Sequence, residues 1–302
     1  MVAERVATRE IVWLGQVAAQ ARQLVGGKVA PLSRLAARYR VPPGFCLTTL
    51  AFEQWEADAD GECLPAALER EIAAAYLALA ERCGAEEPAV AVRSSAVDED
   101  GAAASFAGQL DTYLNVVGAA AVCEAVARCR SSAHSSRVAD YRRRHGLPAN
   151  GARLAVLVQQ LVVADVSAVV FSANPLTGSR AEVVINASWG LGESVVGGSV
   201  TPDTYVVRSE DWTVAERLVA EKRRMSVAVA GGTREVAVPR LLWTQPALRD
   251  EQAAEMARLA GDLERTMGWP VDVECAYRDD VLYLLQCRPI TTLGATAEPG
   301  RR

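Results

Sequence analysis

Hydrophobic and polar positions divide the chain into segments with two different periodicities. Apolar side chains fall on one face of residues 64–83, which predicts an amphipathic helix. Further helices are predicted over 31–39, 119–144 and 251–267. Short apolar runs bounded by turn residues predict strands at 89–93, 112–116, 154–163, 167–171 and 182–186. Helices interleaved with strands and hairpins predict an α+β fold class.

A cluster of turn residues at 146–151 interrupts this pattern near the middle of the chain. We therefore expect an N-terminal lobe of about residues 1–150 and a C-terminal lobe of about residues 151–293, with a flexible tail at 294–302. A chain of 302 residues is long enough to form two lobes with a cleft between them.

Two strand-type runs, 271–277 and 281–288, close the predicted fold as a hairpin, because the turn residues 278–280 separate them. Asp272 and Glu274 share one face of the first strand, since side chains alternate along a strand. The opposite face is apolar and is predicted to pack on a core through Val271, Val273, Tyr283 and Leu285.

Gln286 and Arg288 fall on the carboxylate face of this hairpin if its loop holds an odd number of residues. Two carboxylates, an amide and a guanidinium on one surface suit a metal-bound polyphosphate. Hard oxygen ligands hold Mg²⁺, and the arginine fork binds phosphate oxygens. The alternative is the solvated face of an ordinary sheet.

Lys28 follows Gly26 and Gly27, and this short motif is a second candidate for phosphate binding. Glycines let the backbone approach a ligand closely, and a lysine ammonium is a compact charge that suits phosphate. The motif is not a P-loop, because the upstream glycine is missing and Val29 replaces the trailing Ser or Thr. A solvated turn lysine is the alternative.

Arg93 lies at the end of a predicted strand, before Ser94-Ser95 and a loop of small residues at 101–108. Such a loop exposes backbone amides and can close over polyphosphate as a lid. The alternative is a surface loop whose residues are small because it must be flexible.

Composition narrows the class of protein. The net charge of −5 and the lack of long Lys/Arg runs argue against a nucleic-acid surface. No apolar stretch reaches membrane-spanning length, and the N-terminus does not have the pattern of a signal peptide. Seven cysteines without C-x-x-C spacing indicate free thiols in a reducing cytoplasm. With only His134 and His145, a histidine-based metal site is not expected.

Several ordered motifs extend from about residue 24 to residue 292. They are Gly26-Gly27-Lys28, Val41-Pro42-Pro43-Gly44-Phe45, Arg93-Ser94-Ser95, Ser105-Phe106-Ala107-Gly108-Gln109, Val158-Gln159-Gln160-Leu161-Val162, Gly190-Leu191-Gly192-Glu193 and Gln286-Cys287-Arg288-Pro289-Ile290-Thr291. Together they resemble the nucleotide-binding domain of pyruvate phosphate dikinase and phosphoenolpyruvate synthase. Rifampicin phosphotransferase and the plant glucan, water dikinases share this domain.

The resemblance implies an ATP-grasp fold in which ATP lies in the cleft between two lobes. It implies that Lys28, Arg93 and Arg288 contact phosphate and act in catalysis, and that Asp272 and Glu274 hold Mg²⁺. The other nucleotide-binding residues that it implies are the lid residues Ser105, Phe106, Ala107 and Gly108, the hinge residues Gln160, Leu161 and Val162 at the adenine, and also Glu193 and Gln286.

The implied activity is an ATP- and Mg²⁺-dependent phosphotransferase of the dikinase type. Such an enzyme splits ATP to AMP and phosphate and passes the β-phosphate to a small molecule or to a histidine on a separate protein. One alternative is an ATP-grasp ligase that activates a carboxylate as an acyl phosphate. Another is the nucleotide-binding subunit of a split dikinase. The sequence specifies neither the acceptor nor the oligomeric state.

Enzymes of this family also carry a swivelling domain with a phosphorylated histidine and a further domain for the acceptor. This sequence ends at Arg302, soon after the Arg288 motif, and neither His134 nor His145 lies in the Thr-Ser-His setting of the relay histidine. We therefore expect a nucleotide-binding chain that acts without those domains in the same polypeptide.

Overall fold

A computed structural model describes residues 10–57, 63–98, 111–133, 135, 138, 140, 143, 153–291 and 293. The expected lid Ser105–Gly108, both histidines and the tail 294–302 lie outside the described residues. The chain divides into two compact units. The first comprises Met1–Arg38, Pro42–Glu99 and Phe106–Leu161, and the second comprises Tyr39–Val41, Asp100–Ser105 and Val162–Arg302.

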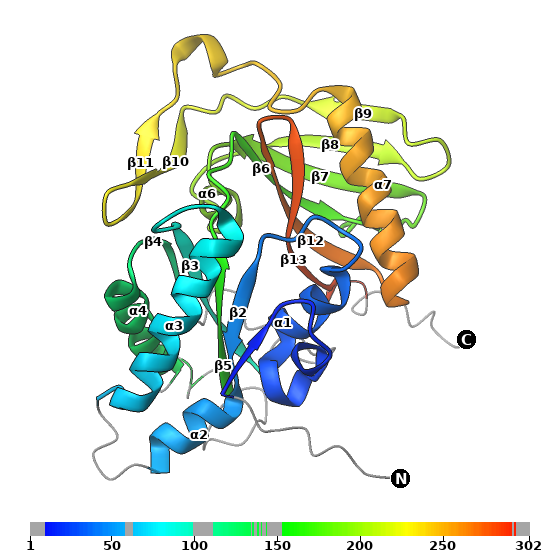
Figure 1. Cartoon of the computed structure of the whole chain (residues 1–302). Coiled ribbons are helices and arrows are strands. Elements are labelled where there is room, and N and C mark those ends of the chain that lie inside the picture. The colour runs from blue at the N-terminus through cyan, green and yellow to red at the C-terminus, as the bar shows by residue number, and fades with distance from the viewer. Residues whose placement is uncertain are drawn as a thin grey trace. The chain divides into compact units, whose positions relative to one another are not determined.

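The first unit is built on a five-stranded antiparallel sheet with the strand order β1-β2-β5-β3-β4 (Figure 1). Its strands are β1 (Ile11–Trp13), β2 (Gly44–Leu47), β3 (Val90–Ala96), β4 (Thr112–Val116) and β5 (Leu154–Gln160). Its helices are η1 (Ala18–Gln20), α1 (Arg22–Leu35), α2 (Thr49–Ala57), α3 (Ala66–Cys83) and α4 (Ala119–Ala133). Helices α1, α2 and α4 pack on the sheet, and α3 packs against α4.

Strand β5 is the central strand of this first sheet, although the sequence analysis assigned residues 154–163 to the second lobe. It pairs with β2 on one side and β3 on the other, and residues 154–159 are buried. A strand covered on both faces has a continuous apolar sequence, which explains the run at 154–158. The long final segment of the second unit therefore begins at Val162, after β5 and not before it.

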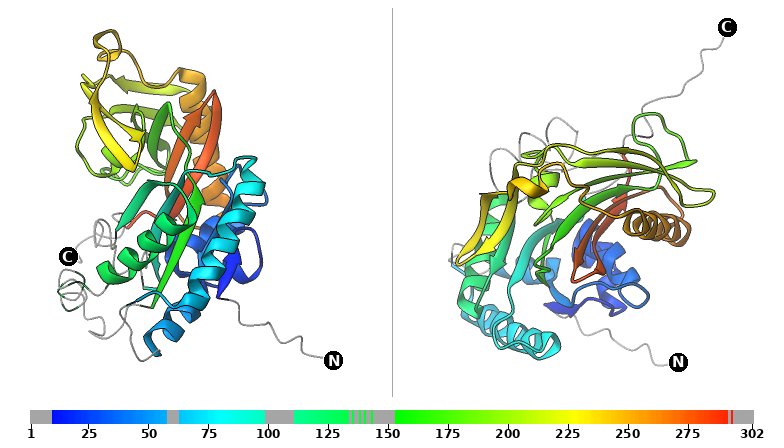
Figure 2. Two further views of the ribbon diagram at one scale, coloured as in Figure 1. Left: turned by 60° about the vertical axis from the view of Figure 1, so that its left-hand side comes forward. Right: turned by 90° about the horizontal axis from the view of Figure 1, so that it is seen from above.

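The second unit contains a six-stranded antiparallel sheet with the strand order β13-β12-β6-β7-β8-β9 and a separate hairpin, β10-β11 (Figure 2). The strands are β6 (Val166–Phe171), β7 (Glu182–Trp189), β8 (Asp203–Arg208), β9 (Val214–Leu218), β10 (Arg224–Val229), β11 (Gly232–Ala237), β12 (Val271–Arg278) and β13 (Val281–Pro289). The helices are α6 (Glu193–Val196), η2 (Arg240–Leu242) and α7 (Asp250–Met267).

Helix α7 covers one face of the six-stranded sheet and contacts β6, β7, β8, β9 and β12. A row of paired residues crosses the sheet on this face and is fully buried: Val273, Val170, Ile185 and Tyr205. The helix buries small and apolar side chains, among them Ala253, Ala257, Ala260 and Leu263. This apolar layer forms the core of the second unit and leaves the other sheet face to carry polar side chains.

The observed mixture of helices and antiparallel sheets confirms the predicted α+β class. The long helices at 66–83 and 250–267 lie close to their predicted bounds. Between β10 and β11 the chain turns at Gly231 and Gly232, which both have positive φ. Strand β9 was not predicted, since its residues are polar and mostly exposed.

Candidate functional site

The hairpin β12-β13 places the four predicted site residues directly opposite one another. Asp272 pairs with Arg288, and Glu274 pairs with Gln286. Directly paired residues point to the same side of a sheet. The structure therefore brings all four side chains to the face that α7 does not cover.

The register that achieves this differs in detail from the sequence-based expectation. The loop holds two residues, Asp279 and Asp280, whose φ angles of 50° and 62° fit a tight hairpin turn. A two-residue loop alone would place Gln286 and Arg288 on the face opposite to the carboxylates. One extra residue, Leu285, forms a β-bulge opposite Glu274 and Cys275 and brings both side chains back to the carboxylate face. The odd number of residues that the sequence analysis required is therefore supplied by the bulge and not by the turn.

Because of the bulge, the residues on the apolar face of β13 differ from those predicted. Val271 and Val273 are fully buried under α7, as predicted. Leu284, not Leu285, pairs with Cys275 on this face, and it is 1% exposed. Tyr283 pairs with Ala276 on the opposite side of the hairpin.

Arg288 and Asp272 form an ion pair at the outer end of this face. The Arg288 Nε and Nη2 groups both lie 2.8 Å from Asp272 Oδ2. The Arg288 side chain is 23% exposed and that of Asp272 is 9% exposed, so the pair is partly accessible to solvent. A guanidinium has five N–H donors, so Arg288 can contact Asp272 and a phosphate group at the same time.

A pocket of about 400 Å³ opens on this face of the second unit. Asp272, Glu274 and Arg288 line one part of it. The rest of the lining comes from β6, β7, β8, α6 and the segment before β8: Val169, Phe171, Asn186, Val195, Val196, Thr201, Pro202 and Thr204. The carboxylates thus lie in a hollow and not on a flat sheet surface.

Lys28 and the Arg93 motif, which the sequence analysis treated separately, lie together in the first unit. Lys28 donates a hydrogen bond from Nζ to the Ser94 carbonyl at 3.0 Å and another from its backbone N–H to Ser95 Oγ at 3.2 Å. Gly26 makes this approach possible, because a Cβ there would lie 2.2 Å from the Ser95 carbonyl oxygen, and its φ is +79°. Arg93 lies beside them in β3.

The hinge residues connect the two units along the chain. The Gln160 N–H donates to the Pro43 carbonyl at 2.9 Å, and the Leu161 N–H donates to the Ala89 carbonyl at 2.8 Å, so both are fixed in the first unit. Val162 is the first residue of the second unit after them.

Glu193 lies at the start of α6 and is held by the neighbouring hairpin. Its carboxylate accepts hydrogen bonds from Ser226 Oγ at 2.9 Å and from Thr233 Oγ1 at 3.0 Å. Gly190 lies against β10, where a Cβ would meet the Ser226 carbonyl oxygen at 2.4 Å. The Gly-Leu-Gly-Glu motif therefore fixes α6, whose residues Val195 and Val196 line the pocket.

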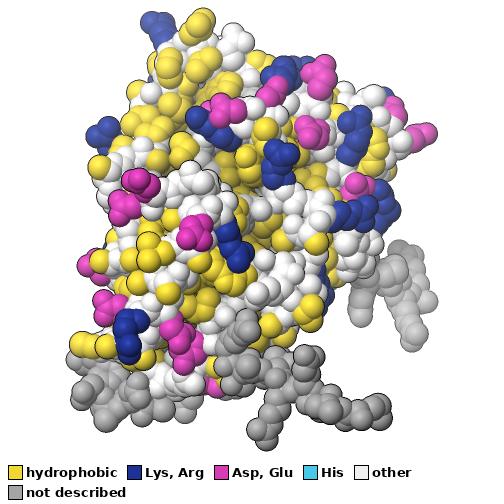
Figure 3. Space-filling view, viewed as in Figure 1, with side chains coloured by type: hydrophobic (Ala, Val, Ile, Leu, Met, Phe, Trp, Pro, Cys, Tyr) yellow, Lys and Arg dark blue, Asp and Glu magenta, His cyan; other side chains and the backbone are white. Residues whose placement is uncertain are grey.

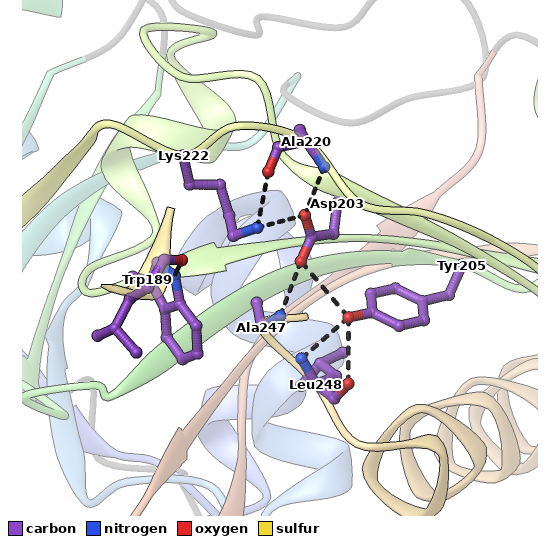
Figure 4. A network of polar contacts seen from close by, with 8 residues as sticks. Trp189, Asp203, Tyr205, Ala220, Lys222, Ala247 and Leu248 are labelled. Carbon is purple, nitrogen blue, oxygen red and sulfur yellow. Dashed lines mark hydrogen bonds and ion pairs between the residues drawn. The ribbon is translucent and has the colours of Figure 1, made fainter. Parts of the chain in front are cut away.

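A buried ion pair on the α7 face was missed by the sequence analysis (Figure 4). The Asp203 carboxylate accepts hydrogen bonds from Lys222 Nζ at 2.5 Å and from the backbone N–H groups of Ala220 and Ala247. Both charged side chains are 0% exposed. The two residues lie 19 positions apart and share no recognisable motif, so only the fold reveals the pair.

The two cysteines of the hairpin lie behind the carboxylate face and are buried. Burial, with a contribution from the nearby Asp272 carboxylate, raises the pKa of the Cys287 thiol to about 12. Burial also raises the pKa of Cys275. Both thiols are therefore protonated at neutral pH. No group of three or more His, Cys, Asp or Glu side chains placed to bind a metal occurs among the described residues.

Oppositely charged side chains are interspersed on the exposed surface of α7 (Figure 3). They include Asp250, Glu251, Asp262 and Arg265. Such a surface is typical of a solvated helix rather than of a nucleic-acid interface. None of the helices in the described ranges is both long and apolar enough to span a membrane.

Comparison with known proteins gives consistent matches. Residues 60–301 match the family described as pyruvate phosphate dikinase, AMP/ATP-binding domain. The chain is 45% identical over 246 residues to the phosphoenolpyruvate synthase of Pyrococcus furiosus, which covers 78% of this chain and 30% of that protein. It is 40% identical over 300 residues to the rifampicin phosphotransferase of Streptomyces sviceus, covering 89% of this chain and 34% of that protein.

A third relative is the prodigiosin synthesizing transferase PigC of Serratia marcescens, which is 36% identical over 283 residues, or 89% of this chain and 32% of that protein. The chain thus spans about a third of the length of these relatives. The family match covers most of the sequence and includes the β12-β13 hairpin. The chain belongs to the family of the pyruvate phosphate dikinase AMP/ATP-binding domain.

Proposed function

We propose that this chain is an ATP-grasp nucleotide-binding domain that binds Mg·ATP and takes part in phosphoryl transfer of the dikinase type. ATP is converted to AMP and phosphate, and the β-phosphate passes to an acceptor that is a small molecule or a histidine of another protein domain. The full-length relatives are named as synthases and transferases, and we extend an activity of that class to this chain as a proposal.

The observation that carries the proposal is the arrangement of Asp272, Glu274 and Arg288 around one pocket. Mg²⁺ in nucleotide sites is bound by one or two carboxylates together with substrate phosphates, so the two hairpin carboxylates fit the metal of Mg·ATP. Gln286 and Arg288 provide N–H donors on the same face, where they can bind phosphate oxygens.

In the first unit, we propose that Lys28 and Arg93 bind phosphate through their cationic groups. Lys28 is positioned for this by its hydrogen bonds to Ser94 and Ser95, which fix its backbone and its ammonium group. The proposal assigns the lid to Ser105–Gly108 and the adenine contacts to Gln160, Leu161 and Val162. It also assigns Glu193 to the nucleotide.

Phosphoryl transfer depends mainly on positioning and on neutralising the charge that develops on the transferring group. When bound with ATP, Mg²⁺ supplies part of that neutralisation. Lys28, Arg93 and Arg288 supply the remaining positive charge. The carboxylates orient the metal end of the substrate, and the apolar side chains of Val169 and Phe171 line the same pocket.

The product nucleotide tests this proposal. Purified chain is incubated with Mg·ATP, alone and with a separately produced phosphohistidine domain of a relative, and the nucleotides are separated by chromatography. We expect AMP to form with the wild-type chain and with the control Glu216→Gln, an exposed position on β9, but not with Glu274→Gln. ADP as the only nucleotide product contradicts the dikinase assignment and supports the ligase alternative.

A further inference from the structure

The pocket extends well beyond the hairpin carboxylates, and this extension contains a polar pair that the proposed function does not use. Asn186 of β7 and Thr204 of β8 are paired neighbours on the same sheet face as Glu274. Thr204 Oγ1 donates a hydrogen bond to Asn186 Oδ1 at 2.9 Å. Both residues line the pocket.

In this hydrogen bond the Asn186 amide turns its oxygen toward the Thr204 hydroxyl. A carboxamide carries an acceptor oxygen and an NH₂ group with two donors. Because the Thr204 hydroxyl occupies the oxygen side, the NH₂ group is the part of Asn186 that remains for a ligand. Within the described part of the chain, this NH₂ group donates to no protein acceptor. The pocket thus presents an oriented donor that suits an anionic oxygen.

The spacing between Glu274 and Asn186 fits one phosphoryl group attached to a metal. The two residues are separated by one strand, since Glu274 pairs with Val169 and Val169 pairs with Asn186. Two strand spacings correspond to about 9–10 Å, and side chains stand roughly perpendicular to the sheet. A path from the Glu274 carboxylate to the Asn186 amide through a metal and a phosphoryl group contains two Mg–O bonds and one N–H···O hydrogen bond, about 7 Å in total. The width of the phosphoryl group adds to this length and brings it close to the strand separation.

The position of the pocket along β6 favours the terminal phosphate over the adenine. Val169 and Phe171 lie at the end of β6 remote from Val162, the residue that the proposed function places at the adenine. The strand from Val166 to Phe171 extends about 16 Å at 3.3 Å per residue. The Asn186 part of the pocket is therefore on the phosphate side of the site.

We infer that Asn186 binds the terminal phosphoryl group of the nucleotide and makes the site selective for nucleoside triphosphates over diphosphates. This assignment rests on the proposed function and deepens it. Thr204 is the positioning residue, because it orients the amide without contacting the phosphate. Val169 and Val195 border the same pocket, and their apolar side chains offer no competing hydrogen bond to the ligand.

Calorimetric titration with Mg·ATP and Mg·ADP tests the inference through affinity alone. For Asn186→Ala we expect about tenfold weaker ATP binding, the equivalent of one charge-assisted hydrogen bond, and ADP binding within about twofold of wild type. Asn186→Asp places a carboxylate beside the phosphate, and we expect a larger loss for ATP. Thr204→Val preserves shape but removes the orienting hydroxyl, and its effect should be smaller than that of Asn186→Ala.

The matched control is Gln245→Glu, which makes the same amide-to-carboxylate change at an exposed loop position of the second unit and should leave both affinities unchanged. Thermal unfolding of every variant verifies that the unit is folded. Equal losses for ATP and ADP, or no loss for either, overturn the inference while leaving Mg·ATP binding in place. Failure of the wild-type chain to bind Mg·ATP overturns the proposed function as well.

Discussion

Two carboxylate–cation pairs lie on opposite faces of the same six-stranded sheet, and they differ in almost every respect except charge. Asp203 and Lys222 are completely buried on the α7 side. Asp272 and Arg288 lie at the pocket on the other side and are 9% and 23% exposed. Both pairs are short, at 2.5 Å and 2.8 Å respectively. Distance alone therefore does not reveal which pair is structural.

The two ion pairs differ in their hydrogen-bond partners. Each Asp203 oxygen accepts a backbone N–H, and Lys222 also donates to the Ala220 carbonyl at 3.0 Å, so the pair is saturated by its own protein (Figure 4). Arg288 and Asp272 instead face a pocket whose volume is open to a ligand. The comparison indicates that the buried pair fixes the sheet, and we propose that the pocket pair exchanges partners with Mg·ATP.

The largest expected effect comes from breaking the buried pair. Lys222→Met leaves the Asp203 carboxylate without its cation in a dry site, and such changes destabilise proteins by about 3–5 kcal/mol. We expect a loss of that size in the free energy of unfolding, measured by urea denaturation at pH 7. Asp203→Asn should be similarly costly, and the double variant should lose less than the sum of the single variants.

The control for this experiment is Arg249→Met, which removes an ion pair to Asp280 whose side chains are 61% and 63% exposed. It should leave the unfolding curve unchanged within error. If Lys222→Met is no more destabilising than this control, the buried pair has no structural role.

The second effect concerns the pocket pair and is measured in binding. Asp272→Asn and Glu274→Gln each remove a proposed Mg²⁺ ligand while keeping the size of the side chain. Since changes even in the residues behind metal ligands reduce affinity 10- to 100-fold, we expect these variants to bind Mg·ATP at least about 100-fold more weakly. Isothermal titration calorimetry gives the affinities, and Glu216→Gln is the matched control.

Stability distinguishes the pocket carboxylates from the buried pair. We expect urea denaturation of Asp272→Asn to give a smaller loss than Lys222→Met, because asparagine keeps an acceptor oxygen for Arg288 and Arg288 is partly exposed. A variant that unfolds readily and binds nucleotide normally when folded would assign Asp272 to structure instead.

A smaller effect is expected for Arg288→Lys. Lysine keeps the charge but loses the planar fork that can contact Asp272 and phosphate together. One lost charge-assisted hydrogen bond corresponds to about tenfold weaker binding of Mg·ATP. Arg217→Lys, at an exposed pair with Asp250, is the control and should bind normally. Wild-type affinity in Arg288→Lys would mean that a point charge is sufficient at this position.

The smallest expected effect is a pH dependence of the free energy of unfolding, caused by Tyr205 beside the buried Asp203–Lys222 pair. Burial, with a further contribution from the nearby Asp203 carboxylate, raises the pKa of Tyr205 to about 12. A raised pKa stabilises the fold below the unfolded-state pKa of about 10 and loses that contribution as the pH rises toward 12. The stability advantage of wild type over Tyr205→Phe should therefore shrink between pH 10 and 12 in urea denaturation. A constant difference over this range contradicts the assignment.

The sequence predicted the pocket pair, Asp272 and Arg288, better than the buried pair, Asp203 and Lys222. Strict alternation in residues 271–274 was sufficient to place two carboxylates on one face, because the side-chain period of a strand is two. The partners across the hairpin were predicted only conditionally, since their register depends on the bulge at Leu285 and an apolar residue in an apolar run gives no signal of a bulge.

Other features depend on contacts that are distant in sequence. Lys28 and Ser94 meet because Gly26 permits a close backbone approach over a separation of 66 residues. The Asp203–Lys222 pair has no motif at all. The boundary of the second lobe was predicted at the turn-rich segment near residue 150, but β5 returns to the first sheet because its apolar run is long enough to be a central strand.

The central claim is that the pocket face of the β12-β13 hairpin binds the metal and phosphates of ATP. A crystal structure with Mn²⁺ and a non-hydrolysable ATP analogue tests this most directly, because manganese replaces magnesium and is located by its anomalous scattering. We expect an anomalous peak in contact with Asp272 and Glu274, and a phosphate group in contact with Arg288. A nucleotide bound with its phosphates away from these three side chains would contradict the account.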